Sequence, residues 1–214
     1  IWLNTKTWGY QTIDPWDKIP SKFSWYVFQS SLDRTLYTIQ NNSTLERYDP
    51  LQKIFISIPL NRDMWEMLRA PTQIAEDWNG DLWMVHQGLC RYRKSTAQID
   101  YCELKFPGAF LNLNTVGNIV NDTIHKKLWF SLYQNGLFRY DPETHDYKQF
   151  TLKEGLPDLV IGQMIIVGRH IWIITPSGLA SISIDDYTIQ RYPYGSGAFL
   201  YHSRKALTYD PETD

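Results

Sequence analysis

Residues 128–144 read LWFSLYQNGLFRYDPET, and the fold can be inferred from the order of residues in this segment. It opens with Trp129, reaches Gly136 seven residues later, and reaches the pair Asp141-Pro142 twelve residues later. An aspartate at the first position of a turn can accept a backbone N–H, and a proline presets φ for the next position. The Asp-Pro pair is therefore expected to end one strand and to begin the next.

The same order of residues recurs along the chain, which indicates an internal repeat. The aromatic anchors are Trp2, Tyr37, Trp83, Trp129 and Trp172, at intervals of 35, 46, 46 and 43 residues. The matching turn positions include the glycines Gly88, Gly136 and Gly178 and the aspartates Asp49 and Asp141. A period of roughly 40 to 50 residues is typical of the blades of a β-propeller.

Each repeat unit is predicted to contain four short antiparallel strands. In residues 74–104, β-rich runs alternate with turns, and Asn79-Gly80 lies in the first of them. Asn-Gly between such runs is a strong hairpin signal because glycine accepts a positive φ. We therefore predict an all-β fold, a propeller of four-stranded blades in which the anchor aromatics fill the wedge between neighbours. The expected units, forming a single or partial propeller domain, are residues 1–20, 21–60, 70–105, 115–152, 160–192 and a partial 195–214.

Composition excludes several classes of protein. The chain has 214 residues, a formal net charge of −2 and 15% aromatic residues. A balanced charge creates no field that attracts nucleic acid, and a disordered chain would not carry so many aromatics. No apolar run approaches the ~18 residues of a membrane-spanning helix.

The ordered set of motifs resembles the two-component regulator propeller repeat. The resemblance rests on residues 76–83 (EDWNGDLW) with Gly88-Leu89, on residues 128–144, and on residues 147–150 followed by the Glu-Gly-Leu-Pro linker at 154–157. It implies a periplasmic or extracellular sensor domain of a bacterial hybrid two-component receptor. It also implies partners, namely further blades or a β-sandwich and a membrane-linked kinase module, while a homodimer stays open.

Signatures of catalysis are absent from the sequence. The chain has no Gly-x-Ser-x-Gly elbow, His-Glu-x-x-His pair, phosphate loop or Cys-x-x-Cys pair. The five histidines do not fall at metal-ligand spacing, and His125 and His170 are expected to be exposed turn residues. We therefore expect no catalytic residue, no metal and no cofactor.

Cys90 and Cys102 are expected on the third and fourth strands of one unit. Pairing of these strands places them either opposite each other or one residue out of register. Only the first arrangement permits a disulfide, because the two Cα atoms must approach within ~7 Å. The second turns the two thiols to opposite faces.

A ligand is expected at the turns between the second and third strands of the units. Aromatic planes beside amides and hydroxyls suit an oligosaccharide or a small metabolite. The residues predicted to bind are Trp8, Asn42, His86, Gln87, Tyr133, Gln134 and Asn135. The same residue types also suit plain hairpin turns, and that alternative stays open.

The leading hypothesis is a non-catalytic, ligand-sensing propeller that passes a signal to flanking modules. One alternative is a propeller enzyme, a lyase or a glycan-active enzyme, with acid and base residues at the channel mouth. Another is a scaffold that binds other proteins. Fold alone does not decide among them.

Overall fold

A computed structural model describes residues 2–5, 9–12, 24–40, 45–58, 73–85, 89–102 and 117–192. Every regular element in these residues is a β-strand, which confirms the all-β prediction. No helix in the described part of the chain is long and apolar enough to cross a membrane.

The strands form four antiparallel sheets of four and one two-stranded ribbon. The first sheet contains β3 (Ser24–Gln29), β4 (Leu36–Gln40), β5 (Leu45–Asp49) and β6 (Ile54–Ser57). The second contains β7 (Ile74–Glu76), β8 (Leu82–Val85), β9 (Leu89–Arg93) and β10 (Gln98–Cys102). The third contains β11 (Ile119–Asp122), β12 (Lys127–Leu132), β13 (Gly136–Tyr140) and β14 (Tyr147–Phe150). The fourth contains β15 (Gln163–Val167), β16 (His170–Thr175), β17 (Gly178–Ser183) and β18 (Ile189–Tyr192).

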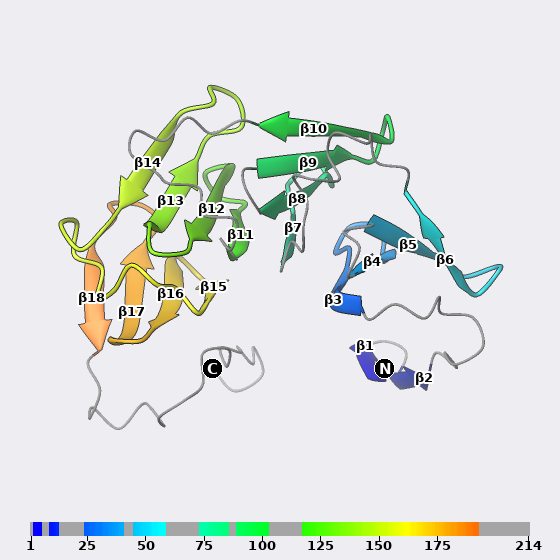
Figure 1. The fold of residues 1–214 in the computed structure, drawn as a ribbon, viewed down its shortest axis with the longest axis horizontal. Helices are drawn as coiled ribbons and strands as arrows, with labels where there is room; N and C mark the ends of the chain where they lie inside the picture. Colours follow the sequence, from blue (N-terminus) through cyan, green and yellow to red (C-terminus); the bar gives the residue numbers. More distant parts are fainter. Residues whose placement is uncertain are drawn as a thin grey trace.

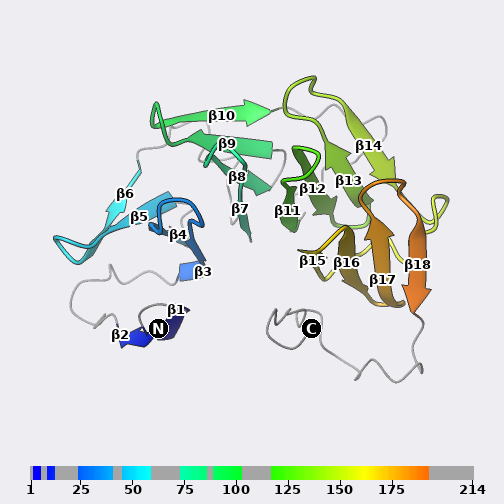
Figure 2. The ribbon, with the colours of Figure 1, turned by 180° about the vertical axis from the view of Figure 1, so that it is seen from behind.

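Each sheet is a meander in which neighbours in sequence are neighbours in space. The four sheets follow one another around an arc, with the first strand of each on the inner side (Figures 1 and 2). The ribbon pairs β1 (Trp2–Thr5) with β2 (Gly9–Thr12). The predicted units 21–60, 70–105, 115–152 and 160–192 each contain one of the four-stranded sheets, whereas residues 195–214 lie outside the described residues.

The hydrophobic core lies between successive sheets. Three clusters of buried side chains each combine residues of two neighbouring sheets. An anchor aromatic of one sheet belongs to each: Tyr37 packs with the second sheet, Trp83 with the third and Trp129 with the fourth. Both faces of an inner sheet are thereby covered, which explains why the repeat uses a large aromatic at this position.

Two anchors differ from these three. Trp172 is half-buried in β16 and stacks on Tyr192, with the ring centroids 5.5 Å apart. Trp2 lies in β1, of which only the backbone is described.

The Asp-Pro turns form as local hydrogen-bonded units. The Oδ1 atom of Asp49 accepts from the backbone N–H groups of Leu51 and Gln52 at 2.8 and 3.1 Å. In the third sheet, Asp141 Oδ1 accepts from the N–H of Glu143 at 3.0 Å. These bonds end the third strand of a unit and redirect the chain into the fourth.

The register of β9 and β10 decides between the two arrangements of the cysteines. Cys90 lies opposite Tyr101, and Cys102 lies opposite Leu89, so the two are one residue out of register. The Cys90 side chain is buried in the core. The arrangement that would permit a disulfide is therefore not the one found.

The expectation of two exposed turn histidines holds in part for each residue: His170 is exposed but is a strand residue, whereas His125 lies in the turn between β11 and β12 but is half-buried. His170 is exposed at the start of β16. The ring of His125 lies between two carboxylates, with Nδ1 2.9 Å from Asp122 Oδ2 and Nε2 3.2 Å from Asp185 Oδ1. Asp185 belongs to the neighbouring sheet, a long-range contact that the local sequence does not reveal.

Candidate functional site

The predicted ligand-binding face is described in part. The turn between β12 and β13 carries three of the predicted residues, Tyr133, Gln134 and Asn135. The other four predicted residues, Trp8, Asn42, His86 and Gln87, lie outside the described residues, as does Gly88.

The described turn presents an aromatic ring beside amide groups. Tyr133 is 45% exposed, an unusual position for a large aromatic in a chain that buries most of them between sheets. Asn135 donates from its side-chain amide to the Tyr133 carbonyl at 2.9 Å, and its own carbonyl accepts from Gln149 Nε2 at 2.8 Å. These bonds hold the turn in one shape while the tyrosine ring faces solvent, which suits stacking on a sugar.

Gly136 fixes this turn against the linker that follows the third sheet. Its φ is +80°, and its N–H donates to the carbonyl of Leu159 at 3.0 Å. A Cβ at this position would overlap the carbonyl oxygen of Phe150 and lie 3.3 Å from Leu156 Cδ1. Only glycine therefore satisfies both the backbone conformation and the close approach.

The linker of residues 151–162 meets the corresponding turn of the fourth sheet. The Ser177 hydroxyl donates to Asp158 Oδ2 at 3.0 Å, and Asp158 Oδ1 accepts from the N–H of Val160 at 2.8 Å. Gly178, the matching glycine of this turn, has a φ of +131°. The two turns and the linker between them thus lie together on one side of the third and fourth sheets.

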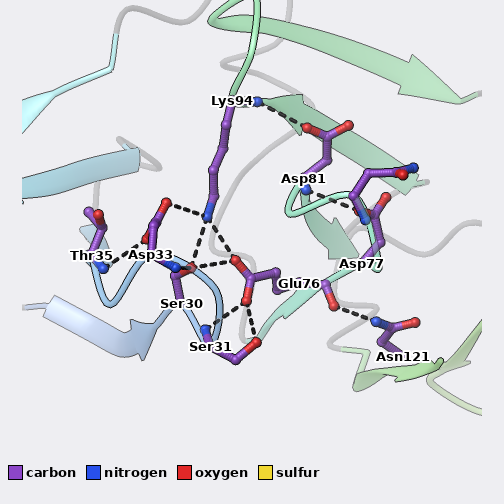
Figure 3. A network of polar contacts seen from close by, with 10 residues as sticks. Ser30, Ser31, Asp33, Thr35, Glu76, Asp77, Asp81, Lys94 and Asn121 are labelled. Carbon is purple, nitrogen blue, oxygen red and sulfur yellow. Dashed lines mark hydrogen bonds and ion pairs between the residues drawn. The ribbon is translucent and has the colours of Figure 1, made fainter.

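The opposite side holds a network of polar contacts between the first and second sheets (Figure 3). The ammonium of Lys94 lies 2.7 Å from Glu76 Oε1, 2.9 Å from Asp33 Oδ2 and 3.0 Å from Ser30 Oγ. The second oxygen of Glu76 accepts from the N–H and the hydroxyl of Ser31, both at 2.7 Å. The Glu76 side chain is only 4% exposed, so this carboxylate is buried but fully bonded.

The pKa values of this network follow from its contacts. Burial opposes ionisation of Asp33, but hydrogen bonds from the Thr35 N–H and from Lys94 outweigh burial and lower the pKa of Asp33 to about 2. Burial likewise opposes ionisation of Glu76, yet the bonds from Lys94, Ser30 and Ser31 lower its pKa. Burial would lower the pKa of Lys94, but hydrogen bonds to the two carboxylates raise it instead. All three groups are therefore charged at neutral pH.

A second set of contacts anchors the Trp83 indole. Its Nε1 donates to Asp77 Oδ2 at 2.7 Å, and Asp77 Oδ1 accepts from the N–H groups of Asn79 and Asp81 at 2.8 and 3.0 Å. The guanidinium of Arg91 lies 5.3 Å from the centroid of the Trp83 ring and pairs with Asp81 at 2.7 Å. Adjacent carboxylates Glu76 and Asp77 thus have separate partners and form no acid–base pair.

The first strands of the sheets are also tied together around the inner side of the arc. Asn121 donates from its side-chain amide to the Glu76 carbonyl at 2.6 Å, and Asn118 donates to the Ile161 carbonyl at 3.2 Å. Each tie joins one sheet to the next. Both acceptors are backbone carbonyls, so these ties use no carboxylate. No group of three or more metal-ligating side chains occurs among the described residues.

An arginine opposite the anchor aromatic is a repeated feature that the sequence reasoning missed. Arg47 pairs in register with Tyr37, Arg91 with Trp83, and Arg139 with Trp129. The signal was present as Leu-x-Arg-Tyr at residues 45–48, 89–92 and 137–140. In the fourth sheet, Ser181 takes this position opposite Trp172.

Comparisons with known proteins give no family by sequence. No family model matches the chain, and no curated protein matches it.

Solved structures do match. The extracellular domain of BT4673 from B. thetaiotaomicron, assigned as a hybrid two-component system, aligns with a TM-score of 0.65 and 19% identity over 79% of this chain and 25% of its own. That of BT3049, assigned likewise, gives a TM-score of 0.61 with 14% identity over 83% of this chain and 25% of its own. The WD40 repeats of RRP9 give 0.62 with 10% identity, over 82% and 52% of the two chains.

At these identities the likeness establishes the fold. The chain spans about a quarter of the length of the extracellular domains it matches first. Its four sheets correspond to four-stranded blades, as the repeat predicted. The chain therefore has an all-β fold of propeller blades and is similar in structure to the extracellular propeller domains of bacterial two-component systems.

Proposed function

We propose that the chain is part of a ligand-sensing propeller of a bacterial receptor, which faces the periplasm or the cell exterior and performs no chemistry. The observation that carries the proposal is the structural likeness to the extracellular domains of two hybrid two-component systems. The repeat motifs of the sequence support the same class independently.

The turn of residues 133–135 is the described part of the proposed binding face. It presents the exposed ring of Tyr133 beside two amide side chains, and glycine and linker contacts hold its backbone. A carbohydrate or a small metabolite with an apolar face fits this combination. Such a ligand would favour one packing of the blades over another, and flanking modules would respond to that shift.

A thermal-shift screen of neutral and acidic oligosaccharides tests the proposal. A ligand that binds the native state stabilises it by about 2.7 kcal/mol at a hundred times its Kd. For a chain of this size, that corresponds to a rise in Tm of roughly 5 to 10 °C.

Tyr133→Ala should reduce the rise in Tm for the same ligand. Leu51→Ala is the matched control, because Leu51 is 93% exposed on a turn between third and fourth strands, at the other end of its sheet. A ligand that stabilises both variants equally would place binding away from this turn. A screen without a stabilising ligand would contradict the sensor proposal.

A further inference from the structure

Two neighbouring sheets carry a tryptophan opposite an arginine at equivalent positions, but the hydrogen bonds of the two pairs differ. In the second sheet, Trp83 lies opposite Arg91, which lies opposite Asp100. In the third sheet, Trp129 lies opposite Arg139, which lies opposite Lys148. We call the residues Trp129, Arg139 and Lys148 the third-sheet row.

In the second sheet, carboxylates accept from both the indole and the guanidinium. Trp83 Nε1 donates to Asp77 Oδ2 at 2.7 Å, and Arg91 Nε donates to Asp81 Oδ2 at 2.9 Å. Asp77 and Asp81, at the two ends of the turn between β7 and β8, supply these oxygens. The row of the second sheet is therefore satisfied within the protein.

In the third sheet, the corresponding carboxylates are replaced or occupied elsewhere. The residue two positions before the anchor is Asp81 in the second sheet and Lys127 in the third, and Lys127 pairs with Asp141 at 2.6 Å. Asp122 is the counterpart of Asp77, and its Oδ2 bonds the ring of His125.

Two buried donors are left without an acceptor as a result. Trp129 Nε1 and Arg139 Nε are both inaccessible to solvent and have no hydrogen-bond partner. The Trp129 side chain is completely buried. A buried donor that has lost water and gained no acceptor raises the free energy of the native state, so two on one cross-strand pair require an explanation.

The positive charges of Arg139 and Lys148 indicate that the missing acceptor is negatively charged. Arg139 and Lys148 are directly opposite each other on neighbouring strands, and like charges in that arrangement repel. Neither forms an ion pair within the residues that the structure describes. Tyr187 of the fourth sheet adds no counter-charge, although its ring centroid lies 5.6 Å from the Arg139 guanidinium and 4.2 Å from the Lys148 ammonium.

Solvent exposure decreases along the third-sheet row from Lys148 to Trp129, which suits a ligand that enters from solvent. Lys148 is exposed, Arg139 is half-buried and Trp129 is buried. All three lie around the Tyr187 ring, whose centroid is 6.0 Å from that of Trp129. A negative group attracted by the lysine would find the guanidinium and the indole N–H further in.

We propose that the third-sheet row binds an oxyanion, a carboxylate, sulfate or phosphate group of a small solute, between the third and fourth sheets. The oxyanion supplies the oxygens that Asp77 and Asp81 supply in the second sheet, and it offsets the repulsion between Arg139 and Lys148. The site lies near the turn that carries Tyr187, at the opposite end of the sheets from residues 133–135. It is therefore a second site, independent of the proposed sugar-binding turn.

Nuclear magnetic resonance of the tryptophan indoles tests the inference directly. The chain has nine tryptophans, and Trp129→Phe identifies the Trp129 indole N–H signal. Titration with sodium sulfate, phosphate or glucuronate, against sodium chloride at equal ionic strength, should move that signal saturably. Arg139→Gln should weaken the apparent affinity about tenfold or more, and Lys148→Gln several-fold, because each removes one charge-assisted contact.

Lys153→Gln is the matched control, since Lys153 is an exposed lysine of the neighbouring linker outside the row. It should leave the titration unchanged. Calorimetric titration of the same anions gives an affinity that does not depend on the assigned signal.

Three results would overturn the inference. One is a Trp129 signal that none of the anions moves. Another is an equal response in the wild type and in Arg139→Gln, which would indicate a general salt effect. The third is a response to an acidic peptide alone, which would assign the row to a protein partner. Loss of sugar binding in Tyr133→Ala would have no bearing on this outcome.

Discussion

Replacement of Gly136 by alanine tests how the candidate binding turn is held. Gly136 has a φ of +80°, a region that costs an alanine about 1 to 2 kcal/mol. The added Cβ would also overlap the Phe150 carbonyl oxygen and lie 3.3 Å from Leu156 Cδ1. Overpacking of this kind costs a further 1 to 3 kcal/mol or so. The expected loss is therefore about 2 to 5 kcal/mol, or roughly 5 to 15 °C in Tm.

The Gly168→Ala variant separates the cost of the positive φ from the cost of the steric overlap. Gly168 also has a positive φ, +56°, but a Cβ added there meets no atom within 4 Å. Its replacement should cost only the backbone term, about 1 to 2 kcal/mol. Urea unfolding followed by tryptophan fluorescence measures both variants against the wild type.

The stabilities of the two variants can show that the linker does not hold the turn. If Gly136→Ala is no less stable than Gly168→Ala, the approach of the linker to the turn does not constrain residues 133–135. A large loss in Gly136→Ala together with retained binding of a Tyr133-dependent ligand would show that the turn's shape is not what the ligand requires.

Further expectations concern the contacts between the sheets. Glu76→Gln should destabilise the chain by about 2 to 4 kcal/mol in urea unfolding, because it leaves Lys94 with one fewer counter-charge in a buried setting; wild-type stability would argue that the network is solvated. Since the folded pKa values of Asp33 and Glu76 are lowered, their contribution is present above the unfolded values and should be lost as the pH falls from about 5 to 2. The raised pKa of Lys94 has the opposite sign, so its contribution should be lost only at strongly alkaline pH. A Tm that does not change across the acid range would contradict the expectation for the two carboxylates. Trp83→Phe should lower the free energy of unfolding by about 1 to 2 kcal/mol more than Trp129→Phe, because of these two indoles only that of Trp83 donates a hydrogen bond within the chain. Equal losses of stability would contradict this difference in hydrogen bonding.

The repeated features of the fold could be predicted from the sequence because each blade packs against its neighbour in the same way. An aromatic at one repeat position must fill the space between two sheets, and Tyr37, Trp83 and Trp129 do so. Turn residues are equally readable, since Asp49 and Asp141 act through bonds to the next few residues.

Contacts between sheets could not be predicted in this way. Whether Cys90 and Cys102 face each other depends on a shift of one residue in pairing, which the local pattern leaves open. The bond from Ser31 to Glu76 and the contact of His125 with Asp185 join positions 45 and 60 residues apart. Such contacts depend on how whole blades sit against each other.

The unpaired hydrogen-bond donors of the third-sheet row could not be predicted from the sequence either. The arginine opposite the anchor was visible in the sequence as Leu-x-Arg-Tyr, but its lack of an acceptor was not. That lack follows from Lys127 standing where the second sheet has Asp81, and from Asp122 bonding His125. Local propensity carries no information about either outcome.

We propose that the propeller binds a ligand and leaves it chemically unchanged. The most direct measurement incubates the chain with the oligosaccharide that stabilises it most and then analyses the ligand by mass spectrometry alongside a calorimetric titration. We expect saturable binding, weakened in Tyr133→Ala, with the ligand recovered intact at every time. A product that accumulates in proportion to protein concentration would contradict the claim and would identify the chain as part of an enzyme.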